Sequence, residues 1–301
     1  MAGFSSKWIS VSEPSPHVLH VELSRKPVNA FSAEFWTEYG ALFDRITREG
    51  RDVRALVLSS ALPKLFSAGI DSASAALPAF LMATAAYLDC CLVADLGARD
   101  ARADAARASL AIHQHITEFQ HAIGAPARCP FPVIAAVHGL VVGLGIDIIS
   151  ACDIRLAAEG TQFTIKEVDV GLAADIGTLA YLPKITGNDS LLRELAYTAR
   201  MFTAAEAARL GLLSTVVPGA REEVVAAALR LAATIAAKSP VAVSGTKRIL
   251  THARDHSVPE NLEYTAAWNA AALHTDDIPE SLRAARERRA PVFSPLQKSK
   301  L

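Results

Sequence analysis

Two continuous apolar runs constrain the fold of this 301-residue chain more than any other feature. Residues 55–58 read Ala-Leu-Val-Leu and residues 133–137 read Val-Ile-Ala-Ala-Val. Strands of parallel sheets that are covered on both faces have such sequences. A helical pattern begins near Ser32, between the N-terminal strand and the first run, and a second helix is expected after the glycine turn at Gly143. Strands that alternate with helices predict an α/β fold with crossover connections.

Shorter patterns extend this prediction along the chain. Residues 17–23 alternate between polar and apolar side chains, which predicts a half-exposed strand. Residues 162–165 predict a short strand. Thr203 and Glu206 have the spacing of a capping box, so a helix is expected to begin there and to end at Gly211.

We expect two regions without a flexible linker between them. Residues 1–205 should form the α/β core with the functional site, and residues 206–301 should form an appended helical region rather than an independent domain. Residues 72–125 are rich in alanine and low in diagnostic chemistry, so we interpret them as amphipathic packing helices.

Composition excludes several classes of function. Half of the residues are hydrophobic (51%), which is ample for a packed interior, and no apolar run is long enough to span a bilayer. A net charge of −1 lacks the basic field that a nucleic-acid partner requires. The cysteines have neither metal-ligand nor C-x-x-C spacing, so we expect reduced thiols and no metal site; they are Cys90, Cys91, Cys129 and Cys152.

Three acidic residues, Asp147, Glu167 and Asp175, lie in apolar or glycine-rich stretches. Burial raises the pKa of a carboxyl group, and neighbouring carboxylates raise it further, which suits proton transfer near neutral pH. Simpler interpretations remain open. Asp147 could be a helix-terminal acid, and Glu167 could be a surface acid that pairs with Lys166. Asp175 could be the N-cap of a helix beginning at Gly177.

Two turns of small residues flank these acids. Residues 66–71 form one turn and would leave the Ala68 N–H free. Residues 143–145 open a helix, and the first N–H groups of a helix have no intrahelical partner. Two such donors that converge on one oxygen form an oxyanion hole.

With these motifs the chain resembles the crotonase (enoyl-CoA hydratase/isomerase) superfamily over about residues 15–290. The stretches that carry the resemblance are residues 27–31, 66–71, 132–139, 151–155, 203–207 and 211–213. The resemblance implies a spiral of repeated ββα units with a C-terminal helical trimerisation region. It also implies acyl-CoA thioester substrates, a homotrimer or homohexamer, and no metal or redox cofactor, since coenzyme A is part of the substrate.

Within that superfamily, residues 166–175 resemble the subfamily that isomerises 3,5-dienoyl-CoA to 2,4-dienoyl-CoA. Asp147 occupies the position of the first hydratase glutamate, and Glu167 that of the second. Asp175 falls where hydratases usually have glycine. Leu144 replaces a common glycine of the oxyanion turn, and we expect its side chain to narrow or redirect the pocket.

The resemblance implies a mechanism for this chain. The N–H groups of Ala68 and Leu144 would bind the thioester carbonyl and stabilise a dienolate. Glu167 would remove the C2 proton and Asp175 would protonate C6, with the reverse order left open, while Asp147 tunes the pair. Further residues expected at the substrate are Ala30, Ser67, Gly69, Ile70, Asp71 and Gly143. The alternatives are a 2-enoyl-CoA hydratase and a catalytically silent acyl-CoA-binding subunit.

The chain ends in Ser299-Lys300-Leu301, a tripeptide that is read as a peroxisomal address. We therefore expect the protein to bind the peroxisomal import receptor and to be located in peroxisomes. Its expected role there is in fatty-acid β-oxidation.

Other charged side chains have two interpretations. The arginines between positions 283 and 289 form either a solvated helix face or a contact for coenzyme A phosphates. Arg25 and Lys26 could contact the same phosphates. We interpret three more polar side chains as structural, namely Asp153, Asp169 and His138.

Overall fold

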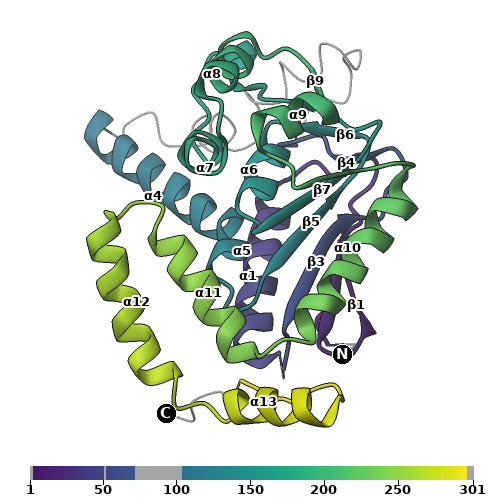
Figure 1. Ribbon diagram of the computed structural model, residues 1–301. Coiled ribbons are helices and arrows are strands. Elements are labelled where there is room, and N and C mark those ends of the chain that lie inside the picture. Colours follow the sequence, from purple (N-terminus) through teal and green to yellow (C-terminus); the bar gives the residue numbers. More distant parts are fainter. Residues whose placement is uncertain (1–2, 51, 72–103, 297–301) are drawn as a thin grey trace.

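The computed structural model describes residues 3–50, 52–71 and 104–296, and its strands form two sheets (Figure 1). The six-stranded sheet has the order β1-β2-β3-β5-β7-β10. Its strands are Ile9–Ser15, Val18–Leu23, Ala55–Ser60, Val133–Val137, Ile154–Ala158 and Thr215–Val217. The four-stranded sheet has the order β4-β6-β8-β9, with strands Leu65–Ser67, Leu140–Val142, Gln162–Thr164 and Phe202–Thr203.

Consecutive strands alternate between the two sheets. In each of the pairs β3–β4, β5–β6 and β7–β8, the first strand joins the large sheet and the second joins the small one. The first members pair with one another in parallel, and so do the second members. Each turn of the chain therefore adds one strand to each layer, which confirms the predicted α/β spiral of repeated units.

Helices cover both faces of the large sheet. α10 (Arg221–Ala236) lies on one face and α1 (Ala33–Glu49) on the other. The other helices of this part of the chain are α4 (Ala105–Ile123), α5 (Ala125–Arg128), α6 (Leu144–Ser150), α7 (Thr178–Ile185), α8 (Asp189–Thr198) and α9 (Ala204–Leu210). In β3, Leu56 and Leu58 belong to the apolar cluster that contains α1, whereas Val57 belongs to the cluster that contains α10. This two-sided burial explains the continuous apolar runs.

The expectation of a half-exposed strand at residues 17–23 was wrong. β2 is buried at every position except Glu22 because both faces of its sheet are covered: Leu19 and Val21 belong to the apolar cluster that contains α1, and Val18 belongs to the cluster that contains α10. Its polar side chains have partners instead of solvent. The His20 Nε2 lies 2.8 Å from the Ser59 hydroxyl, and Glu22 forms an ion pair with Arg221.

The helix caps and the helix-ending glycine predicted from the sequence are confirmed. The Ser32 side chain caps α1, and Thr203 and Glu206 form the capping box of α9. Gly211 ends α9 in the left-handed conformation, with a φ of 90°. Gly143 precedes α6 with a φ of 48°, which glycine adopts without strain.

The C-terminal region predicted as residues 206–301 supplies part of the body formed by the two sheets and their helices, and it also forms helices that extend from this body. The boundary at residues 205/206 falls inside α9, and β10 and α10 after it belong to the large sheet and its cover. Three later helices follow; they are α11 (Pro240–His252), α12 (Val258–Ala272) and α13 (Asp277–Glu287). α11 lies beside α5, whereas α12 and α13 extend from the body (Figure 1).

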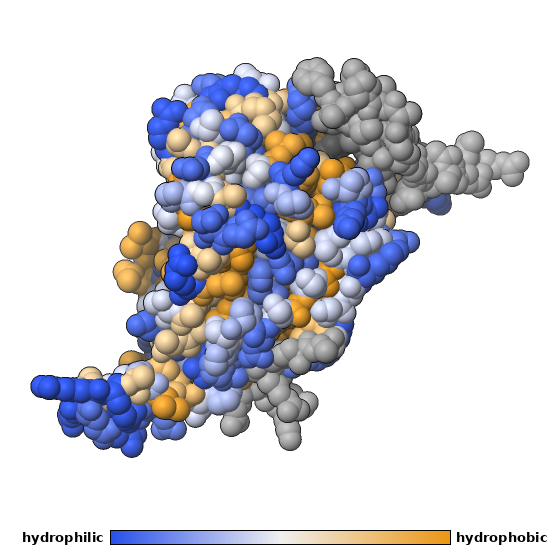
Figure 2. All heavy atoms as spheres, turned by 90° about the vertical axis from the view of Figure 1, so that its right-hand side faces the viewer, coloured by the Kyte–Doolittle hydropathy of each residue, from blue (hydrophilic) through white to orange (hydrophobic). Residues whose placement is uncertain are grey.

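The surface on the α10 side is mainly hydrophilic, with apolar patches between the polar residues (Figure 2). In the described ranges, no single helix is long and apolar enough to cross a membrane. Only α10 and α11 together, bent by 111°, have the length and composition for it.

Candidate active site

The fold brings the three acids together. Asp147 lies on α6, Glu167 begins the short 3-10 helix η1 (Glu167–Val170), and Asp175 lies in the loop before α7. The charge of Asp175 raises the pKa of Asp147, and the charges of both aspartates raise the pKa of Glu167. The three carboxyl groups are thus close enough to act on one another, as one site requires.

Glu167 is the most isolated acid of the cluster. It is 1% exposed, and neither carboxyl oxygen has a hydrogen-bond partner in the described part of the chain. Burial, with the charge of Asp147 in addition, raises its pKa to about 8. The alternative of a surface pair with Lys166 was wrong, because Lys166 pairs with Asp169. A Cβ atom on Gly143 would lie 3.1 Å from Glu167 Oε1, so this carboxyl lies against the turn before α6.

Asp147 lies at two helix beginnings. It is in the first turn of α6, and its Oδ1 accepts a hydrogen bond of 2.6 Å from the backbone N–H of Thr178, the first residue of α7. Burial raises its pKa to about 6, although the Thr178 bond opposes this effect. The helix-terminal interpretation of Asp147 is therefore correct, and it is compatible with a place in the acid cluster.

Asp175 is the acid with access to solvent. It is half-buried, and burial raises its pKa, whereas the charge of His115 lowers it. The N-cap of α7 is Gly177, and the side chain that accepts the first N–H of this helix is Asp147, so the capping interpretation of Asp175 was wrong. The backbone carbonyl of Asp175 accepts a bond of 2.6 Å from Gln120 Nε2 on α4.

The Ala68 N–H is not free, which contradicts the expected oxyanion donor. It donates to the Val28 carbonyl at 3.0 Å. The reason is a parallel bridge between two loops, in which the Phe31 N–H donates to Gly69 and the Asp71 N–H donates to Phe31. This pairing could not be read from the small residues of the turn.

The same bridge leaves a different donor available. The Ile70 N–H points away from the paired loop and has no hydrogen-bond partner in the described residues. The Leu144 N–H, the first of α6, also has none there. A Cβ atom on Gly69 would lie 3.8 Å from the Leu144 nitrogen, so the two turns approach closely. Ile70 and Leu144 are the pair of donors that the geometry supports.

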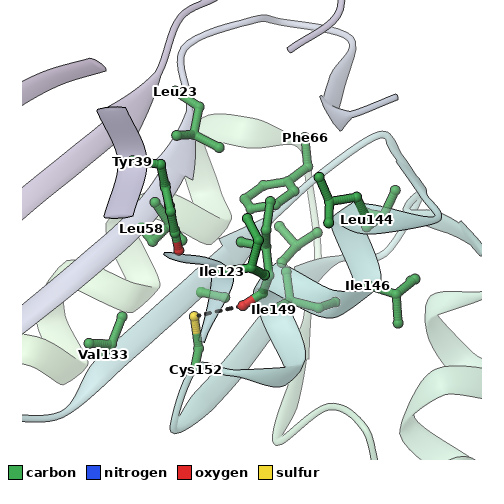
Figure 3. Close-up of a cluster of buried hydrophobic side chains, with 14 of the residues drawn as sticks. Leu23, Tyr39, Leu58, Phe66, Ile123, Val133, Leu144, Ile146, Ile149 and Cys152 are labelled. Atoms are coloured by element: carbon green, nitrogen blue, oxygen red, sulfur yellow. Dashed lines mark hydrogen bonds between the residues drawn. The ribbon is translucent and has the colours of Figure 1, made fainter. Parts of the chain in front are cut away.

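The Leu144 side chain faces the core. It is 1% exposed and lies beside Phe66 in the apolar cluster drawn in Figure 3, which also contains Ile149 and Cys152. The expectation that it narrows or redirects the pocket was therefore wrong. A residue at this position offers its N–H to the site while its side chain stabilises the interior.

Several expected substrate residues have structural bonds in the turns. Arg25 donates to the Ala30 carbonyl and pairs with Asp71, each at 2.5 Å. The Ser67 hydroxyl donates to the carbonyl of Asn29. Sequence reasoning missed Asn29, whose φ is 49° and whose buried side-chain amide donates to groups on three strands. The acceptors are the Leu23 carbonyl, the Ser60 hydroxyl and the Phe66 carbonyl. A substrate role for these residues stays a prediction.

The polar residues interpreted as structural are confirmed. His138 Nε2 lies 2.7 Å from the Leu62 carbonyl, and Asp153 pairs with Lys247 at 2.7 Å. In the arginine cluster, both Arg283 and Arg289 pair with Glu280, as on a solvated helix face.

The described ranges contain no group of three or more His, Cys, Asp or Glu side chains that could hold a metal ion. Cys129 and Cys152 are buried free thiols, as expected. Cys90, Cys91 and the terminal tripeptide lie outside the described residues.

Comparisons with known proteins agree with this geometry. The family model described as enoyl-CoA hydratase/isomerase matches residues 13–79 and 99–295. The chain is 45% identical to the mitochondrial Delta(3,5)-Delta(2,4)-dienoyl-CoA isomerase of Homo sapiens, covering 93% of this chain and 80% of that protein. It is 37% identical to the peroxisomal Delta(3,5)-Delta(2,4)-dienoyl-CoA isomerase of Arabidopsis thaliana, covering 93% of each.

Solved structures show the same architecture. A putative enoyl-CoA hydratase from Streptomyces coelicolor A3(2) superposes with a TM-score of 0.78 at 28% identity, covering 96% of each chain. The enoyl-CoA hydratase from Bacillus anthracis gives a TM-score of 0.78 at 25% identity, covering 95% of this chain and 99% of that one.

Proposed function

The chain belongs to the enoyl-CoA hydratase/isomerase family, and we propose that within it this protein isomerises 3,5-dienoyl-CoA thioesters to 2,4-dienoyl-CoA in fatty-acid β-oxidation. The observation that carries the proposal is the cluster of three acids, in which half-buried Asp175 adds a second proton-transfer group to the buried Asp147 and Glu167. The 45% identity to a named dienoyl-CoA isomerase supports it independently.

Substrate activation falls to the two backbone donors. The N–H groups of Ile70 and Leu144 bind the thioester oxygen and stabilise the negative charge that develops there when C2 loses its proton. One such donor contributes about 3–4 kcal/mol in known oxyanion holes. Coenzyme A is part of the substrate, and no separate cofactor takes part in this scheme.

Two acids move the protons. Glu167 lies against Gly143, next to the Leu144 donor, so it is adjacent to the thioester and removes the C2 proton. The electron pair spreads over the conjugated chain to C6. Asp175, on the neighbouring loop, gives its proton to C6. One C–H bond breaks and one forms, and the double bonds shift without gain or loss of atoms.

The protonation states fit a site that holds one mobile proton. Because the pKa of Glu167 is raised to about 8, the shared proton rests mainly on Glu167 near neutral pH, and forward turnover starts from the minor arrangement in which Glu167 is ionised and Asp175 holds the proton. It ends with a proton on Glu167, the arrangement that the raised pKa favours. Half-buried Asp175 then regains a proton from solvent, and Glu167 releases its own. The buried charge of Asp147 raises the pKa of Glu167 and so tunes the exchange.

The assay that tests this function supplies purified protein with a 3,5-dienoyl-CoA and follows the conjugated product by ultraviolet absorbance. We expect rapid isomerisation and slow or no hydration of a 2-enoyl-CoA. Rapid 3-hydroxyacyl-CoA formation without isomerisation would instead identify a hydratase. Tight acyl-CoA binding without turnover of either thioester would identify a silent binding subunit.

We further propose a peroxisomal location through Ser299-Lys300-Leu301 and the import receptor that reads such a signal. The Arabidopsis thaliana relative is named peroxisomal, whereas the Homo sapiens relative is named mitochondrial. A fluorescent protein fused to the N-terminus should enter peroxisomes with the intact tail and remain outside when the tripeptide is deleted. Mitochondrial import of both fusions would contradict this.

We also propose that the chain forms a homotrimer or homohexamer through its C-terminal helices. Light scattering during gel filtration tests the assembly directly. A mass of three or six chains is expected, and a monomeric mass at micromolar concentration would contradict it.

A further inference from the structure

The loop of residues 171–177, which carries the third acid of the cluster, is attached at both ends to the other two acidic residues. Near its beginning, the Leu172 N–H donates to the backbone carbonyl of Glu167 at 3.2 Å. Where α7 follows it, the Thr178 N–H donates to Asp147 Oδ1 at 2.6 Å. The positions of Glu167 and Asp147 therefore fix the ends of the loop.

Between these two attachments, a single hydrogen bond joins the loop to another element. Gln120 Nε2 of α4 donates to the Asp175 carbonyl at 2.6 Å. Within the described ranges, residues 173–176 have no other hydrogen bond to the rest of the chain. Ile176 adds an apolar contact, since its side chain belongs to the core cluster that contains α1. Gln120 is thus the polar contact that holds the middle of the loop.

This contact is made with the backbone of the acid itself. The Asp175 carboxyl accepts no hydrogen bond from another residue in the part of the chain that the structure describes. Only one methylene separates that carboxyl from the backbone, so the place of the backbone decides which atoms the carboxyl can reach. Displacement of a reacting group by about 1 Å can lower a rate substantially.

We propose that Gln120 is a positioning residue, which holds the backbone of Asp175 so that its carboxyl reaches C6 of the bound dienoyl chain. The part that concerns C6 rests on the proposed function. The Gln120 side chain has its hydrogen bond with the Asp175 loop and none with Glu167 or with the backbone donors of the oxyanion site. C2 deprotonation should therefore not depend on Gln120.

Three variants separate the donor from the rest of the side chain. Gln120→Met keeps a similar length and removes the N–H donor, and because Gln120 is exposed the protein should unfold at the wild-type temperature. Gln120→Lys supplies a donor of similar reach. The matched control is Gln114→Met, because Gln114 is exposed on the same helix and donates to Glu118 of that helix instead of to the loop.

The first measurement does not depend on catalysis. Hydrogen–deuterium exchange of the amides of residues 173–177 should be faster in Gln120→Met by about 2- to 10-fold, as expected for the loss of one hydrogen bond. Exchange should return toward the wild-type rate in Gln120→Lys and should be unchanged in Gln114→Met. An unchanged exchange rate in Gln120→Met would overturn the proposal.

The second measurement compares isomerisation of 3,5-dienoyl-CoA with exchange of its C2 hydrogens in D₂O. In Gln120→Met, kcat for isomerisation should fall by about 3- to 10-fold, less than the ~10²–10⁴-fold of a proton-transfer group itself. KM and the rate of C2 exchange should keep their wild-type values. A general structural defect would instead lower both reactions equally.

Wild-type kcat in Gln120→Met, or an equal loss of isomerisation and C2 exchange, would overturn the proposed role of Gln120. If the loop amides exchange faster in Gln120→Met but neither the wild type nor any variant isomerises the substrate, the proposed function fails. In that case the hold of Gln120 on the Asp175 loop stands.

Discussion

Buried charged side chains occur in two regions of this molecule, which differ in how many hydrogen bonds these side chains make. In the first, Lys247 of α11 is fully bonded. Its Nζ donates to the carbonyls of Pro126 and Phe131 at 2.8 and 3.0 Å and pairs with Asp153 at 2.7 Å. The Asp153 carboxylate also accepts the Val133 N–H. These bonds hold α11 to α5 and to the beginning of β5.

In the second region, Glu167 is buried without any hydrogen-bond partner among the described residues, and Asp147 has one backbone bond. The pKa of Glu167 rises to about 8 as a consequence. An acid left without donors holds its proton near neutral pH, whereas a paired carboxylate does not. The comparison teaches that a missing partner, rather than burial alone, distinguishes Glu167 of the candidate site from the structural acid Asp153.

The largest effect is expected from the acid cluster. Asp175→Asn removes the group that we propose protonates C6 and should lower the isomerisation rate by about 10²–10⁴-fold. Its unfolding transition should stay close to that of the wild type, because the Asp175 side chain makes no structural hydrogen bond in the described residues. Ultraviolet assay and thermal unfolding test both parts, and a fully active variant would remove Asp175 from the mechanism.

In the region around Lys247, a substitution should lower the stability of the protein and leave its turnover unchanged. Lys247→Met leaves the Asp153 carboxylate without its ion-pair partner, and such a loss typically costs about 3–5 kcal/mol of unfolding free energy. Urea unfolding measures it, with Lys238→Met as the control because Lys238 is exposed. The folded fraction should keep its wild-type turnover. A stable but inactive Lys247→Met protein would show that the comparison is wrong.

Glu167→Gln should abolish isomerisation and should increase the free energy of unfolding at high pH. Because burial raises the folded-state pKa of Glu167 from 4.5 to about 8, the stability linked to its proton is full below pH 4.5 and is lost as the pH rises through 8. The variant has no such loss and should be more stable at pH 9, by about 2–4 kcal/mol. Thermal unfolding at pH 5 and pH 9 checks this, and an equal pH dependence in both proteins would argue against a protonated, partnerless Glu167.

Much of this architecture was predictable from local sequence. The apolar runs at residues 55–58 and 133–137 are strands covered on both faces, and the caps at Ser32 and Thr203 begin helices as expected. The acids could be identified because carboxylates in apolar stretches are rarely without a role.

Other features depend on contacts between distant segments. The sequence predicts Ala68 as a donor, because it does not reveal which N–H groups the bridge between Phe31 and Ile70 uses. The burial of β2 depends on α1 and α10, which cover opposite faces of its sheet. Gln120 lies in an alanine-rich helix, and only the fold reveals that its side chain donates to the carbonyl of Asp175.

Solvent exchange in D₂O tests the two-acid mechanism most directly. We predict that Asp175→Asn still exchanges the C2 hydrogens of 3,5-dienoyl-CoA for deuterium, because Glu167 and the oxyanion donors remain, although it forms no 2,4-dienoyl product. Glu167→Gln should show neither exchange nor isomerisation. Loss of C2 exchange in Asp175→Asn, with exchange retained in Glu167→Gln, would contradict the assignment of Glu167 to C2 and Asp175 to C6.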